Sequence, residues 1–369
     1  MTERVLVCVL AKTRAHKLTY ESFEKQVLQE LDADLALALT VNEDYDRDNV
    51  YWRRARFKWI ASDPQDYGPV FDGAQLELCR QRGIASQDWR RLLRFPGTWA
   101  GRIESATSHP SASSILIFCR WLLLQGLLRD DVLEHYDRFI ITRSDYVWLC
   151  PHPPLSILGR ENVWVPDDHH WSGINDRHAI VSREHVVSFL NGLEDIVLKP
   201  EELLSDMQQR DAWNDEQMLA LHLRRENLLA RVREFPYVMY AAHPAGDRTP
   251  TWARGRYEPS VGHYVKYESE FRAARAMASL VRSRSDWQQG RWKQLDIDGF
   301  REPGYSLRER LAHRIDKGRV VFLDQLSRPG RRRRAVEWCQ RKLQRNGPVA
   351  GGAFVASPQY EQLSRKRAF

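Results

Sequence analysis

The sequence predicts an α/β fold built on a mostly parallel central sheet flanked by helices. The opening run from Val5 to Ala11 is short, continuous and apolar, which is typical of a buried parallel strand. Residues Leu18 to Leu31 carry apolar side chains at helical spacing, and a second apolar run follows from Asp34 to Val41. A strand, a helix and a strand in this order favour a parallel sheet with a right-handed crossover.

Later segments continue this alternation of apolar strands and amphipathic helices. Helices are expected over Ser113–Leu128 and Asp215–Asn227, and a further helix is expected to begin near Ser182. Short strands are expected at Phe139–Thr142, Asn162–Pro166 and Arg177–Val181. Residues 42–110 are polar, aromatic and rich in turn residues, and their order of elements is not predicted.

The charge of the chain divides it into two expected domains. Residues 271–369 hold 23 Lys and Arg against 9 Asp and Glu, a net charge of +14, whereas residues 1–270 hold 33 against 40, a net charge of −7. We therefore expect one α/β domain over 1–270 and a basic, mainly helical C-terminal region over 271–369. This basic region suits an anionic lipid surface, a nucleic acid or simple solvation. Nucleic acid is the least favoured, because no aromatic RNA-binding motif or helix-turn-helix is present.

The cysteines and the hydropathy indicate a reducing compartment. The five cysteines are odd in number and widely spaced, which argues against a disulfide framework and against a cysteine-based zinc site. No stretch reaches the roughly 18 apolar residues that a membrane span needs. We expect a cytoplasmic protein, peripheral on the inner face of the membrane if the basic region binds lipid.

The strand expected at Phe139–Thr142 ends directly at Arg143, Ser144 and Asp145. Ligands of open α/β sheets bind just beyond the carboxyl ends of the strands. A carboxylate at Asp145 can hold a divalent metal such as Mn²⁺ or Mg²⁺, which would neutralise a diphosphate. Arg143 can instead meet phosphate directly through its planar guanidinium. The alternative is an Arg–Asp pair that only closes the strand end.

Two further segments place acids beside expected elements. Asn175 and Asp176 follow a glycine turn and suit hydrogen bonds to sugar hydroxyls, and Asp176 is also a candidate base for an acceptor hydroxyl. Asp215 and Glu216 stand in the first turn of a helix that Asn214 can cap. Helix capping alone accounts for these two acids, and a role in binding the acceptor or as a base is the competing interpretation.

A late segment alternates aromatic residues with cations. It contains Arg254 and Lys266 among several tyrosines, and such a segment suits a cleft for a sugar diphosphate or a lid over it. The alternative is a surface loop with scattered cations.

Together these segments resemble bacterial lipopolysaccharide- and capsule-type glycosyltransferases of the GT-A fold. The resemblance covers roughly residues 4–270, and its order along the chain is more specific than any one motif. The matching stretches are Ser108–Trp121, Tyr136–Tyr146, Gly173–Ala179, the helix that holds Glu216, and Phe235–Tyr240.

The resemblance implies transfer of a sugar from a nucleotide-sugar donor to a glycan or glycolipid acceptor. It implies that Asp145 occupies the metal- or donor-binding position, and that the loop after the first strand, with Lys12 and Arg14, touches the nucleotide. Two departures stand out. Arg143 replaces the first acid of the family's Asp-X-Asp motif, and the first loop lacks its usual glycine. An inactive nucleotide- or sugar-binding module is therefore the alternative function, and nucleic-acid binding through the basic region is a third.

Overall fold

The computed structural model describes residues 3–104, 113–167, 169–245 and 255–290. Its centre is a seven-stranded sheet in the order β3-β2-β1-β4-β7-β6-β8. The strands are β1 (Val5–Ala11), β2 (Asp34–Val41), β3 (Phe57–Ser62), β4 (Arg138–Thr142), β6 (Val163–Pro166), β7 (Ala179–Ser182) and β8 (Val232–Phe235). Four of the six pairings are parallel and only β7 runs against its neighbours, so the predicted mostly parallel α/β class is confirmed.

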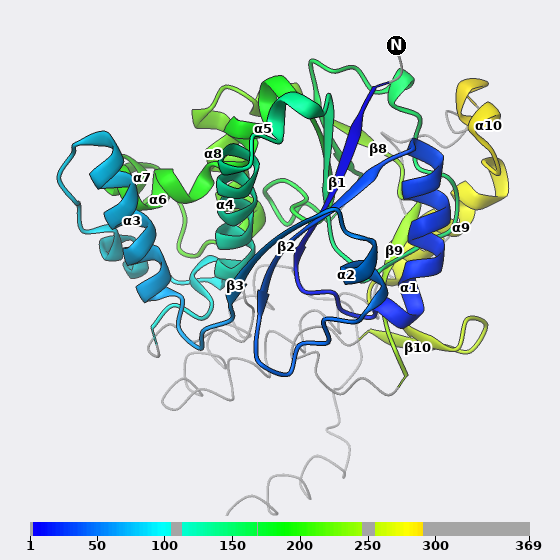
Figure 1. Cartoon of the computed structure of the whole chain (residues 1–369), viewed down its shortest axis with the longest axis horizontal. Helices are drawn as coiled ribbons and strands as arrows, with labels where there is room; N and C mark the ends of the chain where they lie inside the picture. Colours follow the sequence, from blue (N-terminus) through cyan, green and yellow to red (C-terminus); the bar gives the residue numbers. More distant parts are fainter. Residues whose placement is uncertain (1–2, 105–112, 168, 246–254, 291–369) are drawn as a thin grey trace, which may run out of the picture. The chain divides into compact units, whose positions relative to one another are not determined.

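Helices cover both faces of this sheet (Figure 1). They are α1 (His16–Phe23), α2 (Val50–Arg54), α3 (Gly68–Arg82), α4 (Ser113–Arg129), α5 (Arg183–Leu190), α6 (Gly192–Leu198), α7 (Pro200–Met207), α8 (Asp215–Arg225), α9 (Glu268–Leu280) and α10 (Arg284–Gln288). Helix α1 continues as a π-helical stretch over Glu24–Gln29, and short 3₁₀ turns occupy Trp89–Arg94, Thr98–Ala100, Leu133–His135, Leu155–Ile157 and Leu229–Arg231.

Strand β1 supplies the core on both faces because its alternate side chains point in opposite directions. Leu6, Cys8 and Leu10 pack with α3 and α4 on one face. The valines between them pack on the other face with α1 and α2. Burial on both faces explains why this strand is continuously apolar.

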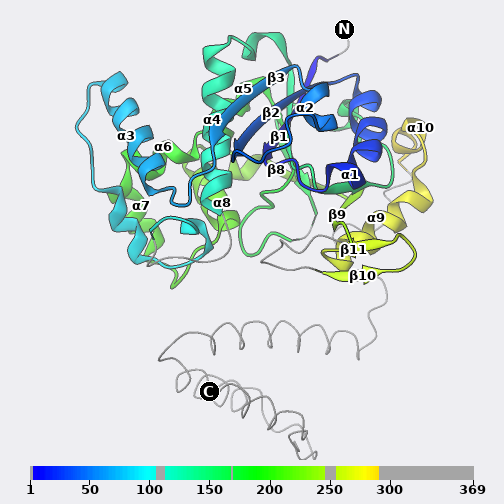
Figure 2. The same cartoon turned by 60° about the horizontal axis from the view of Figure 1, so that its bottom comes forward.

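A second, four-stranded antiparallel sheet stands beside the first. Its order is β10-β11-β9-β5, with β5 (Tyr146–Trp148), β9 (Met239–His243), β10 (Arg256–Glu258) and β11 (His263–Val265). Figure 2 shows β10 and β11 next to α9. The chain passes from the large sheet to the small one between β4 and β5, so residues 143–145 form the crossing between the two sheets.

The predicted elements match the structure closely where the sequence is strongly apolar. The strands expected at 5–11, 34–41 and 139–142 are confirmed, and so are the helices expected at 113–128 and 215–227. The unassigned stretch 42–110 contains β3, α2 and α3. Helix α9 spans the expected boundary at residue 270 and packs on β9 through Phe271 and Ala274, so the folded unit continues past that boundary. The expected helical region beyond residue 290 lies outside the described residues.

None of the helices in the described ranges is long and apolar enough to cross a membrane. The four cysteines in these ranges are buried free thiols.

Two mid-helix glycines allow a matched test of the packing of α4. A methyl group at Gly126 would overlap the ring of Trp59, whereas a methyl group at Gly73 in α3 would meet nothing. We expect Gly126→Ala to lower the free energy of unfolding by about 1–3 kcal/mol because of overpacking. Gly73→Ala should raise it by up to about 1 kcal/mol through helix propensity. Urea unfolding measures both, and equal stability of the two variants would contradict the packing of α4 on β3.

Candidate active site

Charged side chains from four segments meet at one edge of the large sheet. Residues 12–14 follow the carboxyl end of β1, and residues 143–145 follow the carboxyl end of β4. Because β7 runs antiparallel to β4, with Ala179 opposite Ile141, residues 175–178 reach the same edge from the start of their strand. The N-terminus of α8, at Asp215, completes the group. This edge is the expected ligand position in an open α/β sheet.

Ser144 fixes the loop after β1 to the crossing between the sheets. Its Oγ lies 2.9 Å from the carbonyl oxygen of Lys12 and 3.0 Å from that of Arg14. The Ser144 carbonyl accepts a hydrogen bond of 2.6 Å from Thr19. Ala11 and Ala15 adopt left-handed backbone conformations, with φ of 70° and 54°. The loop thus makes its tight turns without the glycine that the resemblance leads one to expect.

Arg143 and Asp145 form a bidentate ion pair. Arg143 Nε lies 3.1 Å from Asp145 Oδ1, and Nη2 lies 2.7 Å from Oδ2. The Asp145 side chain is only 2% exposed. Burial alone would raise the pKa of Asp145, but the cations of Arg143, Lys266 and Arg14 outweigh it and hold that pKa well below its usual range. Asp145 is therefore an ionised, fully paired carboxylate at neutral pH.

The contacts of Asp145 do not fit a divalent metal. Both of its carboxylate oxygens accept from Arg143, so a divalent metal would have to displace the guanidinium or bind directly beside its positive charge. Among the residues that the structure describes, Asp145 belongs to no set of three ligand atoms close enough to hold an ion. Of the three interpretations open at this strand end, the Arg–Asp pair is the one that the structure displays, and contact between Arg143 and an anion stays a prediction.

Lys266 directly follows β11 and faces the same ion pair. Its backbone N–H donates to the Ala241 carbonyl over 2.9 Å, which fixes its place beside β9. Its Nζ makes no ion pair or hydrogen bond within the described ranges, and it lies 5.2 Å from the centre of the Tyr267 ring. Burial and then the charge of Arg143 lower the pKa of Lys266 to about 8, against the opposing effect of Asp145.

Arg177 adds a third cation at this edge. Its Nη1 lies 2.6 Å from Glu270 Oε1, and Glu270 Oε2 accepts from the Ala241 N–H over 2.9 Å. The Arg177 side chain is 5% exposed, and its Nη2 has no hydrogen-bond partner in the described part of the chain. Strand β7, the small sheet and helix α9 therefore meet through one buried arginine.

A buried carboxyl cluster lies near Arg143 and Arg177, whose charges lower the pKa of Asp176. Arg120 Nη2, from α4, lies 3.1 Å from Asp215 Oδ2 and 3.8 Å from Asp176 Oδ2. The carboxyls of Asp176 and Asp215 share a hydrogen bond. Burial and the neighbouring Asp176 raise the pKa of Asp215 to about 8, while hydrogen bonding and the nearby arginines lower that of Asp176. The pair thus holds one proton near neutral pH.

Glu216 borders this cluster on the first turn of α8. Burial and the charges of Asp176 and Asp215 raise the pKa of Glu216 to about 8. Gly173 lies against the Glu216 backbone so closely that any side chain at this glycine would overlap it, and the Ile174 N–H donates to the Glu216 carbonyl over 2.9 Å. Asn214 does cap α8, as the capping interpretation predicts. Capping does not account for the burial of Asp215 against Arg120.

The remaining predicted donor-binding residues differ in their surroundings. Asn175 is fully buried, its Nδ2 donates to Tyr237 over 2.8 Å, and its Oδ1 accepts from the Arg177 N–H. It therefore holds the turn before β7 in shape. Lys12 forms an ion pair of 2.6 Å with Asp63 at the end of β3. Arg254 lies outside the described residues.

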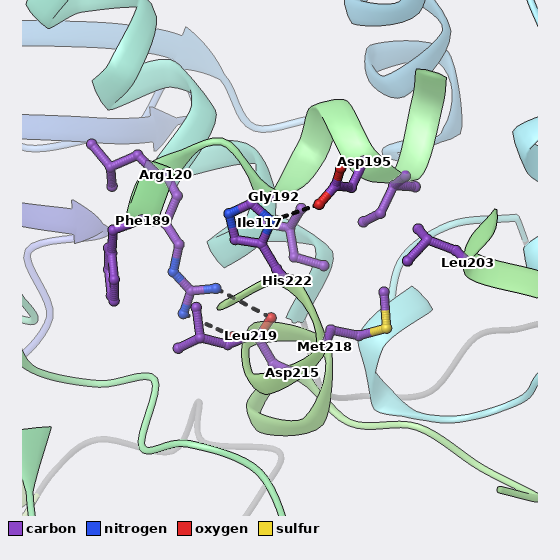
Figure 3. A pocket seen from close by; sticks show the side chains of 12 residues that line it. Ile117, Arg120, Phe189, Gly192, Asp195, Leu203, Asp215, Met218, Leu219 and His222 are labelled. Atoms are coloured by element: carbon purple, nitrogen blue, oxygen red, sulfur yellow. Dashed lines mark hydrogen bonds and ion pairs between the residues drawn. The ribbon is translucent and has the colours of Figure 1, made fainter. Parts of the chain in front are cut away.

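An apolar pocket lies beside the carboxyl cluster, between α4, α5, α6, α7 and α8 (Figure 3). Arg120 and Asp215 form one of its walls, and the remaining wall is mostly aliphatic. A second buried pair lines it, with His222 Nδ1 2.7 Å from Asp195 Oδ2 and His222 Nε2 2.6 Å from the Ser188 carbonyl. Both ring nitrogens are thus engaged by the protein. The mostly apolar lining of the pocket contributes to the burial that raises the pKa of Asp215.

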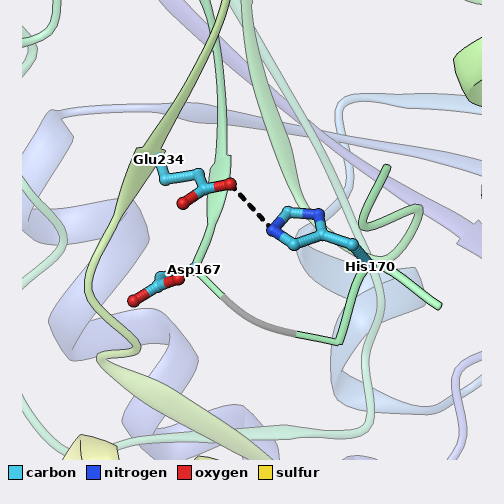
Figure 4. Close-up of side chains that lie close together, drawn as sticks. All are labelled: Asp167, His170 and Glu234. Carbon is cyan, nitrogen blue, oxygen red and sulfur yellow. Dashed lines mark ion pairs between the residues drawn. The ribbon is translucent and has the colours of Figure 1, made fainter. Parts of the chain in front are cut away.

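A separate group of possible metal ligands joins the end of β6 to β8 (Figure 4). It consists of Asp167, His170 and Glu234, whose ligand atoms lie within 4.8 Å of one another. His170 Nδ1 accepts a hydrogen bond of 3.1 Å from the Asn175 N–H. In the neutral ring the proton therefore lies on Nε2. This Nε2 atom lies 2.9 Å from Glu234 Oε1. A metal would need the Nε2 lone pair instead, so this arrangement favours a His–Glu contact over an ion.

The sequence prediction missed Arg120, Arg177 and Glu270. Arg120 had a visible signal, because it is a lone charge within the otherwise apolar run from Ser113 to Leu128. Arg177 carried no such signal, since only the fold shows that its partner lies on α9. Glu270 lies at the expected boundary between the α/β domain and the basic C-terminal region, so it was not considered as part of the site.

Comparison with known proteins finds similarity among solved structures. No protein-family model and no curated protein matches it. Among solved structures, mouse xyloside xylosyltransferase 1 in its apo form matches with 9% identity and a TM-score of 0.35, over 63% of this chain and 84% of that one. The galactosyltransferase LgtC, in complex with donor and acceptor sugar analogues, matches with 11% identity and a TM-score of 0.32, over 62% and 72%. Similarity this weak assigns no activity, so function rests on the side chains of the site.

The raised pKa of Asp215 predicts a pH-dependent stability. The folded state keeps a proton that an unfolded Asp loses near pH ~3.9, so stability falls as pH rises from there through the folded pKa of about 8. The slope is about 1.4 kcal/mol per pH unit for one proton. Asp215→Asn removes the titrating carboxyl. We therefore expect the free energy of unfolding, measured in urea, to fall less steeply with pH in this variant between about pH 5 and about pH 7.5.

Glu77→Gln is the matched control, because Glu77 is an exposed acid on α3. Its slope should equal that of the unmodified chain. If the free energy of unfolding of Asp215→Asn has the same pH dependence as that of the unmodified chain, Asp215 is ionised like an ordinary surface acid.

Proposed function

We propose that this protein transfers a glycosyl group from a nucleotide-sugar donor to a hydroxyl group of a glycan or glycolipid acceptor. One observation carries the proposal: cations with unused N–H groups lie directly beside a buried pair of carboxyls, at the ligand-binding edge of an α/β sheet. Cations suit a diphosphate leaving group, and carboxyls suit the proton of an attacking hydroxyl. The resemblance of the sequence to GT-A glycosyltransferases supports the same reaction.

The cations would bind the donor through its diphosphate. Arg143 and Lys266 face this edge from the two sheets, and the loop of Lys12 and Arg14 is fixed to it by Ser144. This loop is proposed to contact the nucleotide. Arg254 belongs to the same proposed set on sequence grounds. Asn175 contributes by shaping the turn that presents Asp176.

The carboxyls would take up the acceptor proton. In the reaction, the acceptor oxygen forms a bond to the anomeric carbon, the bond from that carbon to the diphosphate breaks, and the hydroxyl proton leaves the acceptor. Asp176 is the proposed base, because its pKa is held low while its partner Asp215 carries the shared proton. Arg120 keeps both carboxyls in place, and Glu216 is proposed to bind the acceptor beside them.

Activity of Asp176→Asn tests the proposal. We expect transfer or donor hydrolysis with one of the UDP-, GDP-, CMP- or dTDP-sugars, and a loss of kcat of about 10²–10⁴-fold in the variant because the base is removed. Asp206→Asn is the matched control, since it makes the same chemical change on α7, outside the site. Donor binding without turnover in the unmodified chain would instead favour the inactive binding module.

The basic region is proposed to hold the enzyme at an anionic membrane, as in synthesis of surface polysaccharide or lipopolysaccharide. The charge of +14 over residues 271–369 supports this. Each basic residue near such a surface adds about 1 kcal/mol. Replacing Arg331, Arg332, Arg333 and Arg334 by Gln should therefore lower co-sedimentation with phosphatidylserine vesicles at least about tenfold. Neutral vesicles are the control. Binding that is the same for anionic and neutral vesicles, and for the unmodified chain and the variant, would contradict the proposed membrane attachment.

A further inference from the structure

We infer that the donor diphosphate is held by Arg143, Arg177 and Lys266 without a divalent metal at Asp145. This inference rests on the proposed function, since it names how the proposed donor is bound. It departs from the expectation that the resemblance raised, in which Asp145 holds Mn²⁺ or Mg²⁺. Three observations of this site carry it.

The first observation is that Arg143 already engages both carboxylate oxygens of Asp145. The guanidinium of Arg143 contacts both of its oxygens, and the Asp145 carbonyl accepts from the Ala242 N–H over 2.9 Å. Breaking a buried ion pair leaves an uncompensated charge, which typically costs several kcal/mol. A metal at Asp145 would therefore have to offset the loss of Arg143 before it could bind the donor.

The second observation is that the three cations keep unused hydrogen-bond donors. Arg143 uses Nε and Nη2 for Asp145, and its Nη1 makes no hydrogen bond to any described residue. Arg177 Nη2 is buried and has no partner there either, and Lys266 Nζ has neither an ion pair nor a hydrogen bond. Of these three donors, Arg177 Nη2 is the one that is fully buried. A buried donor without an acceptor is costly, so it marks a place for a ligand that supplies acceptor oxygens.

The third observation is the balance of charge around these donors. Arg143 is paired with Asp145 and Arg177 with Glu270, while Lys266 has no carboxylate of its own within the described ranges. The Arg177 guanidinium and Lys266 Nζ lie 4.8 Å and 5.2 Å from the centre of the same Tyr267 ring, and the charges of Arg143 and Arg177 both lower the pKa of Lys266. An anion with several oxygens and more than one negative charge, such as a diphosphate, satisfies both the charge and the donors.

Binding of inorganic pyrophosphate and of UDP, GDP, CDP and dTDP to the full chain tests the inference by calorimetry. We expect at least one nucleoside diphosphate to bind in EDTA with a Kd within about threefold of that in Mn²⁺ or Mg²⁺. Lys266→Gln should weaken this binding about ten- to hundredfold, because one charge-assisted contact is lost. Lys58→Gln is the matched control, since Lys58 is an exposed lysine on β3, and it should leave the Kd unchanged.

Arg143→Ala adds a second arm. This variant frees the oxygens of Asp145, so we expect Mn²⁺ to strengthen nucleotide binding in the variant and not in the unmodified chain. The electron paramagnetic resonance signal of Mn²⁺ reports its capture directly. If Arg143→Ala does not fold, Lys266→Gln and the EDTA comparison still decide the question, because Lys266 has no ion pair to lose.

Two outcomes would overturn the inference: binding that needs Mn²⁺ or Mg²⁺ in the unmodified chain, or binding that Lys266→Gln leaves intact. Failure of the proposed function looks different. Metal-independent, Lys266-dependent binding of a nucleoside diphosphate with no transfer from any nucleotide-sugar would uphold the anion site and refute the enzyme. Transfer that requires a metal would uphold the enzyme and refute the inference.

Discussion

The buried ion pair between Arg143 and Asp145 is the constraint on which the rest of the site depends. It stands where the chain leaves the large sheet at β4 and enters the small sheet at β5, so its geometry sets how the two sheets meet. Ser144, between the two charges, fixes the loop after β1 to the same point. Because a buried charge must keep its partner, the pair restricts this crossing to one arrangement.

A group of cations and a group of carboxyls lie at the same edge of the large sheet, next to this ion pair. On one side, cations outnumber the carboxylates that face them, and on the other side Asp176, Asp215 and Glu216 outnumber Arg120. The site therefore places an excess of cations next to a partly protonated group of acids. Such an arrangement suits a reaction in which an anionic group leaves at one end and a proton is accepted at the other.

The sequence predicted the parts of this molecule in which burial dictates composition. Strands β1, β2 and β4 are buried on both faces and are therefore continuously apolar, whereas β3 is an edge strand with half-exposed side chains and gave no such run. The position of Arg143 and Asp145 at a strand end was predictable for the same reason. The pairing of Arg143 with Asp145 was not predictable. Whether Asp145 binds a metal or a guanidinium depends on the directions of the two side chains, which their spacing in the sequence does not determine. Arg177 and Glu270 were missed because they are 93 residues apart and meet only through the tertiary fold.

The position of Glu270 on helix α9 has a consequence for how the protein matures during synthesis. Arg177 emerges from the ribosome long before its counter-ion, so the chain must carry an unpaired guanidinium in a partly formed interior until α9 has been made. The strands of the large sheet all lie within the first 235 residues, whereas β10, β11 and α9, which packs on β9, come later in the chain. A nascent chain that stops short of α9 therefore contains the strands of the large sheet but lacks Glu270, the carboxylate that pairs with Arg177.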